Sequence, residues 1–149
     1  MNFIKFAKVR DVKSPEHGTS GSNGIDFFVP NDFEEKQVIF GEDILIPSGI
    51  KFNLPEEHCI LLLNKSGIAR NFGLDVGACL IDSDYQGEVH LHLFHVKDPG
   101  MVITIKPGLK LVQGILLYAP TMKLNELNES ELYSEKTFRG TGGFGSTGD

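Results

Sequence analysis

The sequence predicts an all-β fold, and three observations support this prediction. Short apolar stretches recur along the chain, each closes at Pro or Gly, and one segment alternates strictly between apolar and polar residues. Several short strands at close spacing are typical of a β-sandwich or barrel rather than of alternating βαβ units.

Four apolar runs are expected to be strands: residues 44–46, 59–63, 101–105 and 114–118. The alternating segment covers residues 89–93. Its pattern puts Val89, Leu91 and Leu93 on one face and His90 and His92 on the other. The segment is therefore predicted to be a strand with one buried face.

Two segments favour short helices. Residues 66–72 fit one or two turns between strands, and residues 123–133 carry three leucines at roughly helical spacing. The second segment is acidic and rich in Asn, so it fits equally well a connector that lies against a neighbour. The sequence shows no internal repeat.

The C-terminal residues 139–149 differ from the rest because they hold five glycines. Such a segment buries too little to offset its ordering entropy, so we expect a flexible arm that closes over a ligand. Glycine lets several backbone N–H groups converge on one anion. We therefore expect a single domain, with a β-rich core over residues 1–138 and an arm over residues 139–149.

Length and charge exclude several classes of protein. The 149 residues fit one domain, and 20 acidic against 14 basic residues, with no Lys/Arg block, argue against nucleic-acid binding. No apolar run approaches the ~18 residues of a membrane span, and the first residues lack a signal peptide. Cys59 and Cys79 lie far apart, with no CxxC and no metal-ligand spacing, which favours free thiols in a reducing compartment such as the cytoplasm over one structural disulfide.

Residues 77–89 form the most informative segment. Asp82, Asp84 and Tyr85 lie in a turn bounded by glycines, between apolar strands. A polar hairpin tip without function fits this pattern, but loops on a rigid scaffold often carry sites.

Five segments together resemble the five ordered motifs of the trimeric dUTP pyrophosphatase (dUTPase) family: residues 22–27, 65–67, 77–87, 108–113 and 139–148. The resemblance implies a distorted jelly-roll or β-sandwich with at most one or two short helices. It also implies a homotrimer whose active sites each take the first, second and fourth motifs from one chain, the third from another and the arm from the remaining one.

The resemblance implies hydrolysis of dUTP to dUMP and pyrophosphate, which keeps uracil out of DNA and supplies dUMP for dTMP synthesis. Asp82 matches the carboxylate that activates a water for attack on the α-phosphorus. Tyr85 matches the residue that packs under the deoxyribose and excludes a 2′-hydroxyl. Cys79, Leu80, Ile81 and His90 match the positions where the family reads uracil, mainly through backbone groups.

The remaining motifs imply phosphate contacts. Lys65, Ser66, Gly67 and Gln113 match phosphate-binding positions, and Asp26 matches a supporting carboxylate. Lys65 and Lys110 stand where the family usually has Arg, which keeps the charge but loses the bidentate fork. In the arm, Phe144 matches an aromatic that stacks on uracil; phosphate partners there are Arg139, Ser146 and Thr147, with Gly145 beside them.

The triphosphate implies Mg²⁺, carried by the substrate rather than by a cluster of protein ligands. A zinc site at His90, His92 and His95 is an alternative, although a trimer-interface or solvent-facing role is preferred. A dCTP deaminase is a rival within the same superfamily, but His92 stands where its Glu base is expected. A dUTPase-like protein that only binds nucleotide and regulates a partner is the rival from a different class.

Overall fold

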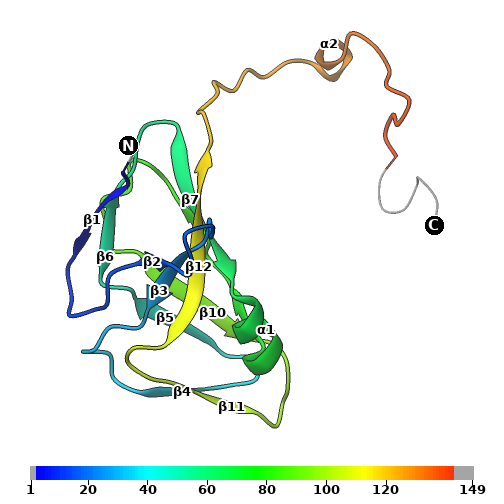
Figure 1. Cartoon of the computed structure of the whole chain (residues 1–149). Coiled ribbons are helices and arrows are strands. Elements are labelled where there is room, and N and C mark those ends of the chain that lie inside the picture. Colours follow the sequence, from blue (N-terminus) through cyan, green and yellow to red (C-terminus); the bar gives the residue numbers. More distant parts are fainter. Residues whose placement is uncertain (1–2, 143–149) are drawn as a thin grey trace.

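The computed structural model describes residues 3–142, which contain twelve strands and two short helices (Figure 1). In chain order these are β1 (Lys5–Lys8), β2 (Glu16–His17), β3 (Ile25–Phe28), β4 (Lys36–Ile39), β5 (Asp43–Pro47), β6 (Ile50–Asn53), β7 (His58–Asn64), α1 (Ser66–Phe72), β8 (Leu74–Val76), β9 (Leu80–Ile81), β10 (His90–His95), β11 (Val102–Ile105), β12 (Lys110–Tyr118) and α2 (Glu129–Leu132). The prediction of a β-rich fold with short helices is confirmed.

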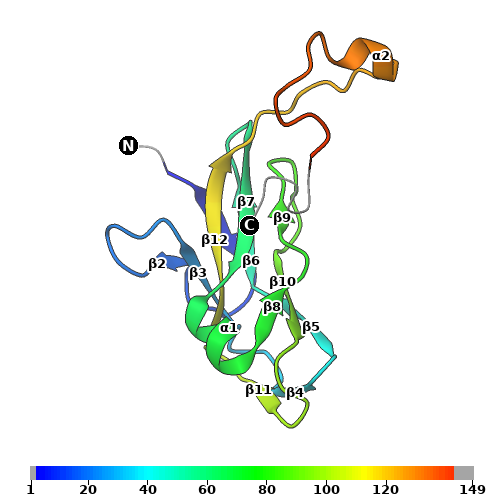
Figure 2. The ribbon, with the colours of Figure 1, turned by 90° about the vertical axis from the view of Figure 1, so that its right-hand side faces the viewer.

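Two sheets form the body of the molecule. The larger has the strand order β2-β3-β12-β7-β9, and the smaller has the order β5-β10-β8. Figure 2 shows them as facing layers, with β12 and β7 on one side and β10, β8 and β5 on the other. The pairs β1-β6 and β11-β4 complete the described strands, and the strand pairs within residues 3–142 are antiparallel.

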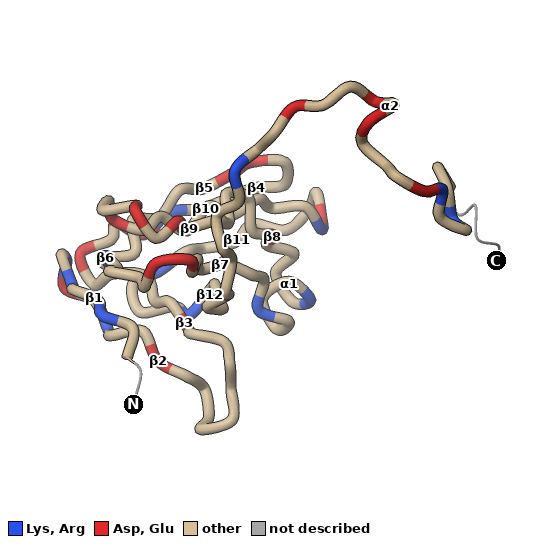
Figure 3. Tube along the Cα trace, turned by 90° about the horizontal axis from the view of Figure 1, so that it is seen from above, with Lys and Arg blue, Asp and Glu red and all other residues tan. Residues whose placement is uncertain are grey.

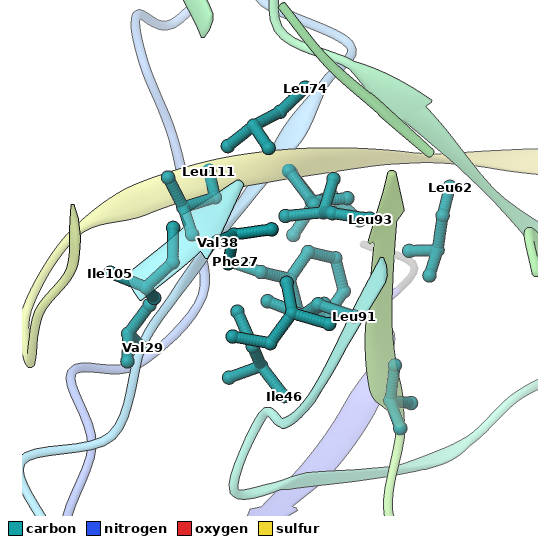
Figure 4. Packing of buried hydrophobic residues seen from close by; sticks show 14 of the residues in the cluster. Phe27, Val29, Val38, Ile46, Leu62, Leu74, Leu91, Leu93, Ile105 and Leu111 are labelled. Atoms are coloured by element: carbon teal, nitrogen blue, oxygen red, sulfur yellow. The ribbon is translucent and has the colours of Figure 1, made fainter. Parts of the chain in front are cut away.

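The core lies between these two layers. Phe27 of β3 and Leu62 of β7 come from the larger sheet, and Ile46, Leu91 and Leu93 come from the smaller one. Figure 4 shows these apolar side chains converging between the strands. Face-to-face packing of two antiparallel sheets over interdigitated side chains defines a sandwich.

The alternation in residues 89–93 is confirmed. Val89, Leu91 and Leu93 are buried, whereas His90 is exposed and His92 is half-buried. The same alternation continues one step further than we expected, so His95 is also fully buried. The expectation of a solvent-facing or interface role for His95 is wrong, because its ring packs in the interior against Phe40.

Of the two predicted helices, one is confirmed over its full length. Helix α1 spans Ser66–Phe72 and ends at Gly73, whose positive φ of 62° gives the left-handed cap that glycine favours. Over residues 123–133 the helix alternative is wrong for most of the length, since only Glu129–Leu132 is helical, and the rest fits the alternative of a connector. Leu124 is 99% exposed, and Leu127 and Leu132 are also exposed, so the three leucines form no buried helix face within residues 3–142.

Segment 77–89 also differs from the expected hairpin tip. Strand β9 pairs with β7 in the larger sheet, whereas β10 pairs with β5 and β8 in the smaller one. The segment therefore leaves the smaller sheet after β8, joins the larger one at β9 and returns to the smaller one at β10, and we call residues 77–89 the crossing loop. None of the helices within residues 3–142 is long and apolar enough to cross a membrane.

Candidate functional site

Two pockets collect most of the predicted site residues that the structure describes. The cationic pocket has a volume of about 360 Å³ and is lined by Lys65, Ser66, Gly67, Ile68, Asn71, Phe72, Lys110 and Gln113. The loop pocket has a volume of about 200 Å³ and is lined by Ala78, Leu80, Ile81, Asp82, Tyr85 and His90. The two pockets share no lining residue.

The cationic pocket forms where β7 leads into α1 beside β12. Strands β7 and β12 pair with Asn64 opposite Val112, which brings Gln113 next to the start of α1. The side-chain amide of Gln113 donates a hydrogen bond of 2.9 Å to the Asn64 carbonyl oxygen. Strand pairing thus unites the second and fourth predicted motifs in one place.

Asp26 organises the charges of this pocket from the buried side. It lies on β3 opposite Gln113 of β12 and is only 3% exposed. One carboxylate oxygen accepts a hydrogen bond from Lys65, and the other lies 2.9 Å from the ammonium nitrogen of Lys110. With all three groups ionised, the cluster carries one net positive charge, which suits a phosphate ligand.

The ion pairs shift the pKa values of this cluster. Burial by itself would raise the pKa of Asp26, but the hydrogen bonds from Lys65 and Lys110, with the attraction of their charges, outweigh burial and lower it. The pKa of Lys110 is raised, first by its hydrogen bond to Asp26 and then by the charge of that carboxylate. Both shifts favour the ionised forms of Asp26 and Lys110.

Sequence patterns missed several residues of the cationic pocket. Lys110 stood out only as a departure from the family pattern, and Ile68, Asn71 and Phe72 gave no motif signal, yet the structure places all four in the lining. Lys and Arg positions occur at both ends of α1 (Figure 3). Asn71 and Phe72 reach the pocket because they lie four positions after Gly67 and Ile68, and residues three or four positions apart share a helix face.

In the loop pocket, a short turn brings Asp82 and Tyr85 together. The backbone N–H of Tyr85 donates to the Asp82 carbonyl oxygen at 3.2 Å, and the Tyr85 hydroxyl donates to the Glu88 carbonyl oxygen at 2.9 Å. A Cβ at position 87 would lie 2.3 Å from that hydroxyl oxygen, so Gly87 is what lets the ring fold back over the loop. Tyr85 remains 44% exposed and available to a ligand.

The Glu88 end of the crossing loop is anchored by charge. Arg10 Nε donates to Glu88 Oε1 at 2.8 Å, and the Gly49 backbone N–H donates to the same oxygen at 2.7 Å. Burial alone would raise the pKa of Glu88, but these hydrogen bonds and the charge of Arg10 outweigh it and lower the pKa. The Glu88 carbonyl oxygen also lies 2.9 Å from His90 Nδ1.

Of the four residues predicted to read the base, three line the loop pocket and Cys79 does not. Leu80, Ile81 and His90 line the loop pocket together with Ala78, which carried no separate signal in the sequence. The Cys79 carbonyl oxygen instead accepts a hydrogen bond of 2.7 Å from the Leu62 N–H, and its side chain packs against the core. Cys79 therefore supports the pocket from behind in this structure.

Of the predicted arm residues, the structure describes Arg139, which lines neither pocket. The chain leaves the sheets after β12 and extends away from them (Figure 1), and Arg139 Nε there donates to the Gly142 carbonyl oxygen at 2.9 Å. The other predicted arm residues, Phe144, Gly145, Ser146 and Thr147, lie outside the described residues. Within residues 3–142 no group of three His, Cys, Asp or Glu side chains could hold a metal ion.

Comparison with known proteins points to one family. A family model described as dUTPase matches residues 10–148 of this chain. The deoxyuridine 5′-triphosphate nucleotidohydrolase of Chlamydia trachomatis serovar L2 is 33% identical over 147 residues, covering 97% of each chain. The enzyme of the same name from Dictyoglomus turgidum is 34% identical over 144 residues, covering 93% of this chain and 92% of its own.

Solved structures show the same fold. The dUTPase of Staphylococcus bacteriophage 80alpha with dUpNHpp superposes with a TM-score of 0.86 over the full length of both chains, at 20% identity. A mutant dUTPase from phage phi11 of S. aureus, described with a structural Mg(II) ion, gives a TM-score of 0.76 at 19% identity, covering 88% of this chain and all of its own.

Proposed function

This chain belongs to the dUTPase family and is a dUTP diphosphatase, and from that premise we propose that Asp82 activates the water that attacks the α-phosphorus of dUTP. The products are dUMP and pyrophosphate. The observation that carries the proposal is that Asp82 and Tyr85 line one pocket, so a carboxylate and an aromatic ring meet the same ligand. An ionised carboxylate accepts a proton from water as the new P–O bond forms.

The cationic pocket is proposed to bind the phosphates. Lys65, Ser66, Gly67 and Gln113 supply positive charge and hydrogen-bond donors, and Lys110 adds a second cation. Asp26 is a positioning residue here, because its carboxylate holds both ammonium groups from the buried side. A lysine contacts phosphate as a point charge rather than as a bidentate fork.

Mg²⁺ is proposed as the cofactor, held by the triphosphate. The donor set fits this arrangement, because Mg²⁺ usually keeps several waters and binds substrate phosphates through few protein ligands. When bound, the ion would neutralise part of the phosphate charge. Lys65, Lys110 and Ser66 would then hold the phosphate groups that carry it.

The loop pocket is proposed to select base and sugar. The walls formed by Leu80, Ile81 and His90 would face uracil and offer backbone groups to its edge, with Cys79 supporting them from the core side. Tyr85 would lie against the deoxyribose, where its ring excludes a 2′-hydroxyl.

Shared active sites in a homotrimer are proposed as the arrangement that joins the two pockets. They share no lining residue within one chain, and Arg139 lies on a segment that leads away from both. A neighbouring chain would bring its crossing loop to the cationic pocket, and a further chain would add its arm over residues 139–149. In the arm, Arg139, Ser146 and Thr147 would contact phosphates, with Gly145 beside them, and Phe144 would stack on uracil.

We propose that residues 1–138 form the core and residues 139–149 the arm of one domain. We propose that the protein is cytoplasmic, limits uracil in DNA and supplies dUMP. Its binding partner is dUTP, and we expect it to bind neither a membrane nor nucleic acid.

An Asp82→Asn variant tests the assignment of the catalytic carboxylate. Turnover of dUTP should fall by about 100-fold or more, the scale of a lost general base, while affinity for dUpNHpp measured by calorimetry stays within a few-fold. The matched control is Asp98→Asn, the same charge change in a turn where Asn can still accept the Gly100 N–H. Undiminished hydrolysis by Asp82→Asn would show that Asp82 is not the base.

A further inference from the structure

His92 links a surface carboxylate to the backbone at the beginning of the crossing loop. Its Nε2 lies 3.0 Å from Asp43 Oδ2 on β5, and the Ala78 backbone N–H donates to its Nδ1 at 3.1 Å. An amide N–H only donates, so Nδ1 is the acceptor and the ring proton is on Nε2, which donates to Asp43. Two hydrogen bonds thus fix the orientation and the tautomer of one imidazole.

Packing holds the ring in this place. The Gly77 N–H donates to the His92 carbonyl oxygen at 2.9 Å, which continues the pairing of β8 with β10. A Cβ at position 77 would lie 2.4 Å from His92 Nδ1 and 2.6 Å from a ring carbon of Phe94. The ring centroids of His92 and Phe94 are 4.6 Å apart. The imidazole therefore lies directly on the backbone of Gly77, within reach of the next amide.

The contact between His92 and Ala78 lies where the chain passes from the smaller sheet to the larger one. After Ala78 the chain leaves the smaller sheet and enters β9 in the larger one, where Leu80 and Ile81 line the loop pocket. Ala78 itself lines that pocket, whereas His92 is absent from its lining. The other end of the crossing loop is anchored at Glu88 by Arg10 and Gly49. The His92 contact is the corresponding anchor at the Ala78 end.

We propose that His92, oriented by Asp43, is a positioning residue that sets base selectivity by holding Ala78 and, through it, the wall of the loop pocket. This inference rests on the proposed role of that pocket in reading the base. His92 acts through the Ala78 N–H and does not touch the nucleotide.

A His92→Phe variant tests the proposal, because it keeps a ring over Gly77 but removes both nitrogens. Losing the hydrogen bond should raise KM for dUTP about tenfold and lower the ratio of kcat/KM for dUTP over dCTP by about the same factor. kcat should change less, because Asp82 keeps its own turn with Tyr85. His58→Phe, at the far end of β7 and outside both pockets, is the control and should keep the wild-type ratio.

Two further variants separate a positioning role from a merely structural one. Asp43 is on the surface, and Asp43→Ala should fold and lower base selectivity by about threefold, since one weak hydrogen bond is lost. In the His92→Phe background the same change should have no further effect. His92→Asn places an amide oxygen near the position of Nδ1, so it should recover part of the selectivity and be insensitive to Asp43→Ala.

NMR signals of His92 and Ala78 test this inference separately from the proposed function, because they do not depend on turnover. In ¹⁵N NMR spectra of the full chain, His92 should show the Nε2–H tautomer, and the Ala78 amide should exchange slowly with solvent. In His92→Phe that protection should fall by about tenfold. An inactive wild type with these signals would contradict the proposed function alone. Wild-type base selectivity in both His92→Phe and Asp43→Ala, or a loss of kcat with an unchanged dUTP/dCTP ratio, would overturn the positioning role.

Discussion

The ammonium nitrogen of Lys110 lies 2.9 Å from the Oδ2 atom of Asp26, a carboxylate that is almost completely buried. The other oxygen of the same group accepts a hydrogen bond from Lys65. A buried charge is tolerated when it is paired, and here one buried anion serves two cations that both reach a pocket. The chain thereby fixes, before any ligand arrives, the two positive groups that we propose for phosphate binding.

Replacing Asp26 with Asn should reduce the acid sensitivity of the fold. The folded pKa of Asp26 lies below its unfolded value, so this group stabilises the fold above the unfolded pKa and loses that contribution as the pH falls through the folded pKa. At pH 7 the variant should lose about 1–3 kcal/mol in the free energy of unfolding, and the difference from wild type should shrink towards pH 2. Urea denaturation across this range measures both quantities.

Part of the acid sensitivity should remain in Asp26→Asn, because the pKa of Glu88 is also lowered. Asp98→Asn is the control for a charge change in an exposed turn outside the cluster of Asp26, Lys65 and Lys110. Curves of stability against pH that stay parallel for wild type and Asp26→Asn would show that the ion pairs contribute nothing to folding.

Tyr85 should control discrimination between dUTP and UTP. Tyr85→Ala removes the ring and opens space beside Asp82, so the preference for dUTP over UTP in kcat/KM should fall by about tenfold or more. Tyr85→Phe keeps the ring and loses only the hydroxyl bond to the Glu88 carbonyl oxygen, so most of the preference should remain. Equal loss in both variants would assign the discrimination to the hydroxyl rather than to steric exclusion.

Deleting residues 139–149 should leave a folded trimer of low activity, since the sheets and both pockets are formed by earlier residues. Turnover of dUTP should fall by about 100-fold, the effect of losing groups that position a substrate. Light scattering and circular dichroism check assembly and folding, and removal of Asp149 alone is the control. A truncated protein with full activity would rule out the role of the arm.

Sequence patterns were reliable where local chemistry decides the structure. Strict alternation located β10 and its buried face, and residues 66–72 were correctly expected to form one or two helical turns between strands. They failed where packing at a distance decides. Strand β3 is buried at all four positions and so lacks alternation, and the leucines of residues 123–133 have helical spacing but are exposed in the described part of the chain.

The candidate site shows the same difference between features set by local sequence and features set by contacts between distant segments. The resemblance to the family's motifs indicated Asp82, Tyr85 and the residues around α1, because each motif is a short continuous segment of the chain. It did not reveal that Asp26 joins Lys65 to Lys110, or that Ala78 binds His92, because those contacts arise from pairing between strands. Such contacts become visible only once the register of the sheets is known.

The most direct test of the whole account is pyrophosphate release with Mg²⁺ from dUTP, measured beside dCTP, dTTP and UTP, with the nucleoside product identified. We expect release from dUTP to be much faster than from dCTP, dTTP or UTP, with dUMP as the product and loss of turnover when Mg²⁺ is chelated. Binding of dUTP without turnover, or conversion of dCTP at a rate comparable to that of dUTP, would contradict the assignment of dUTP as the substrate.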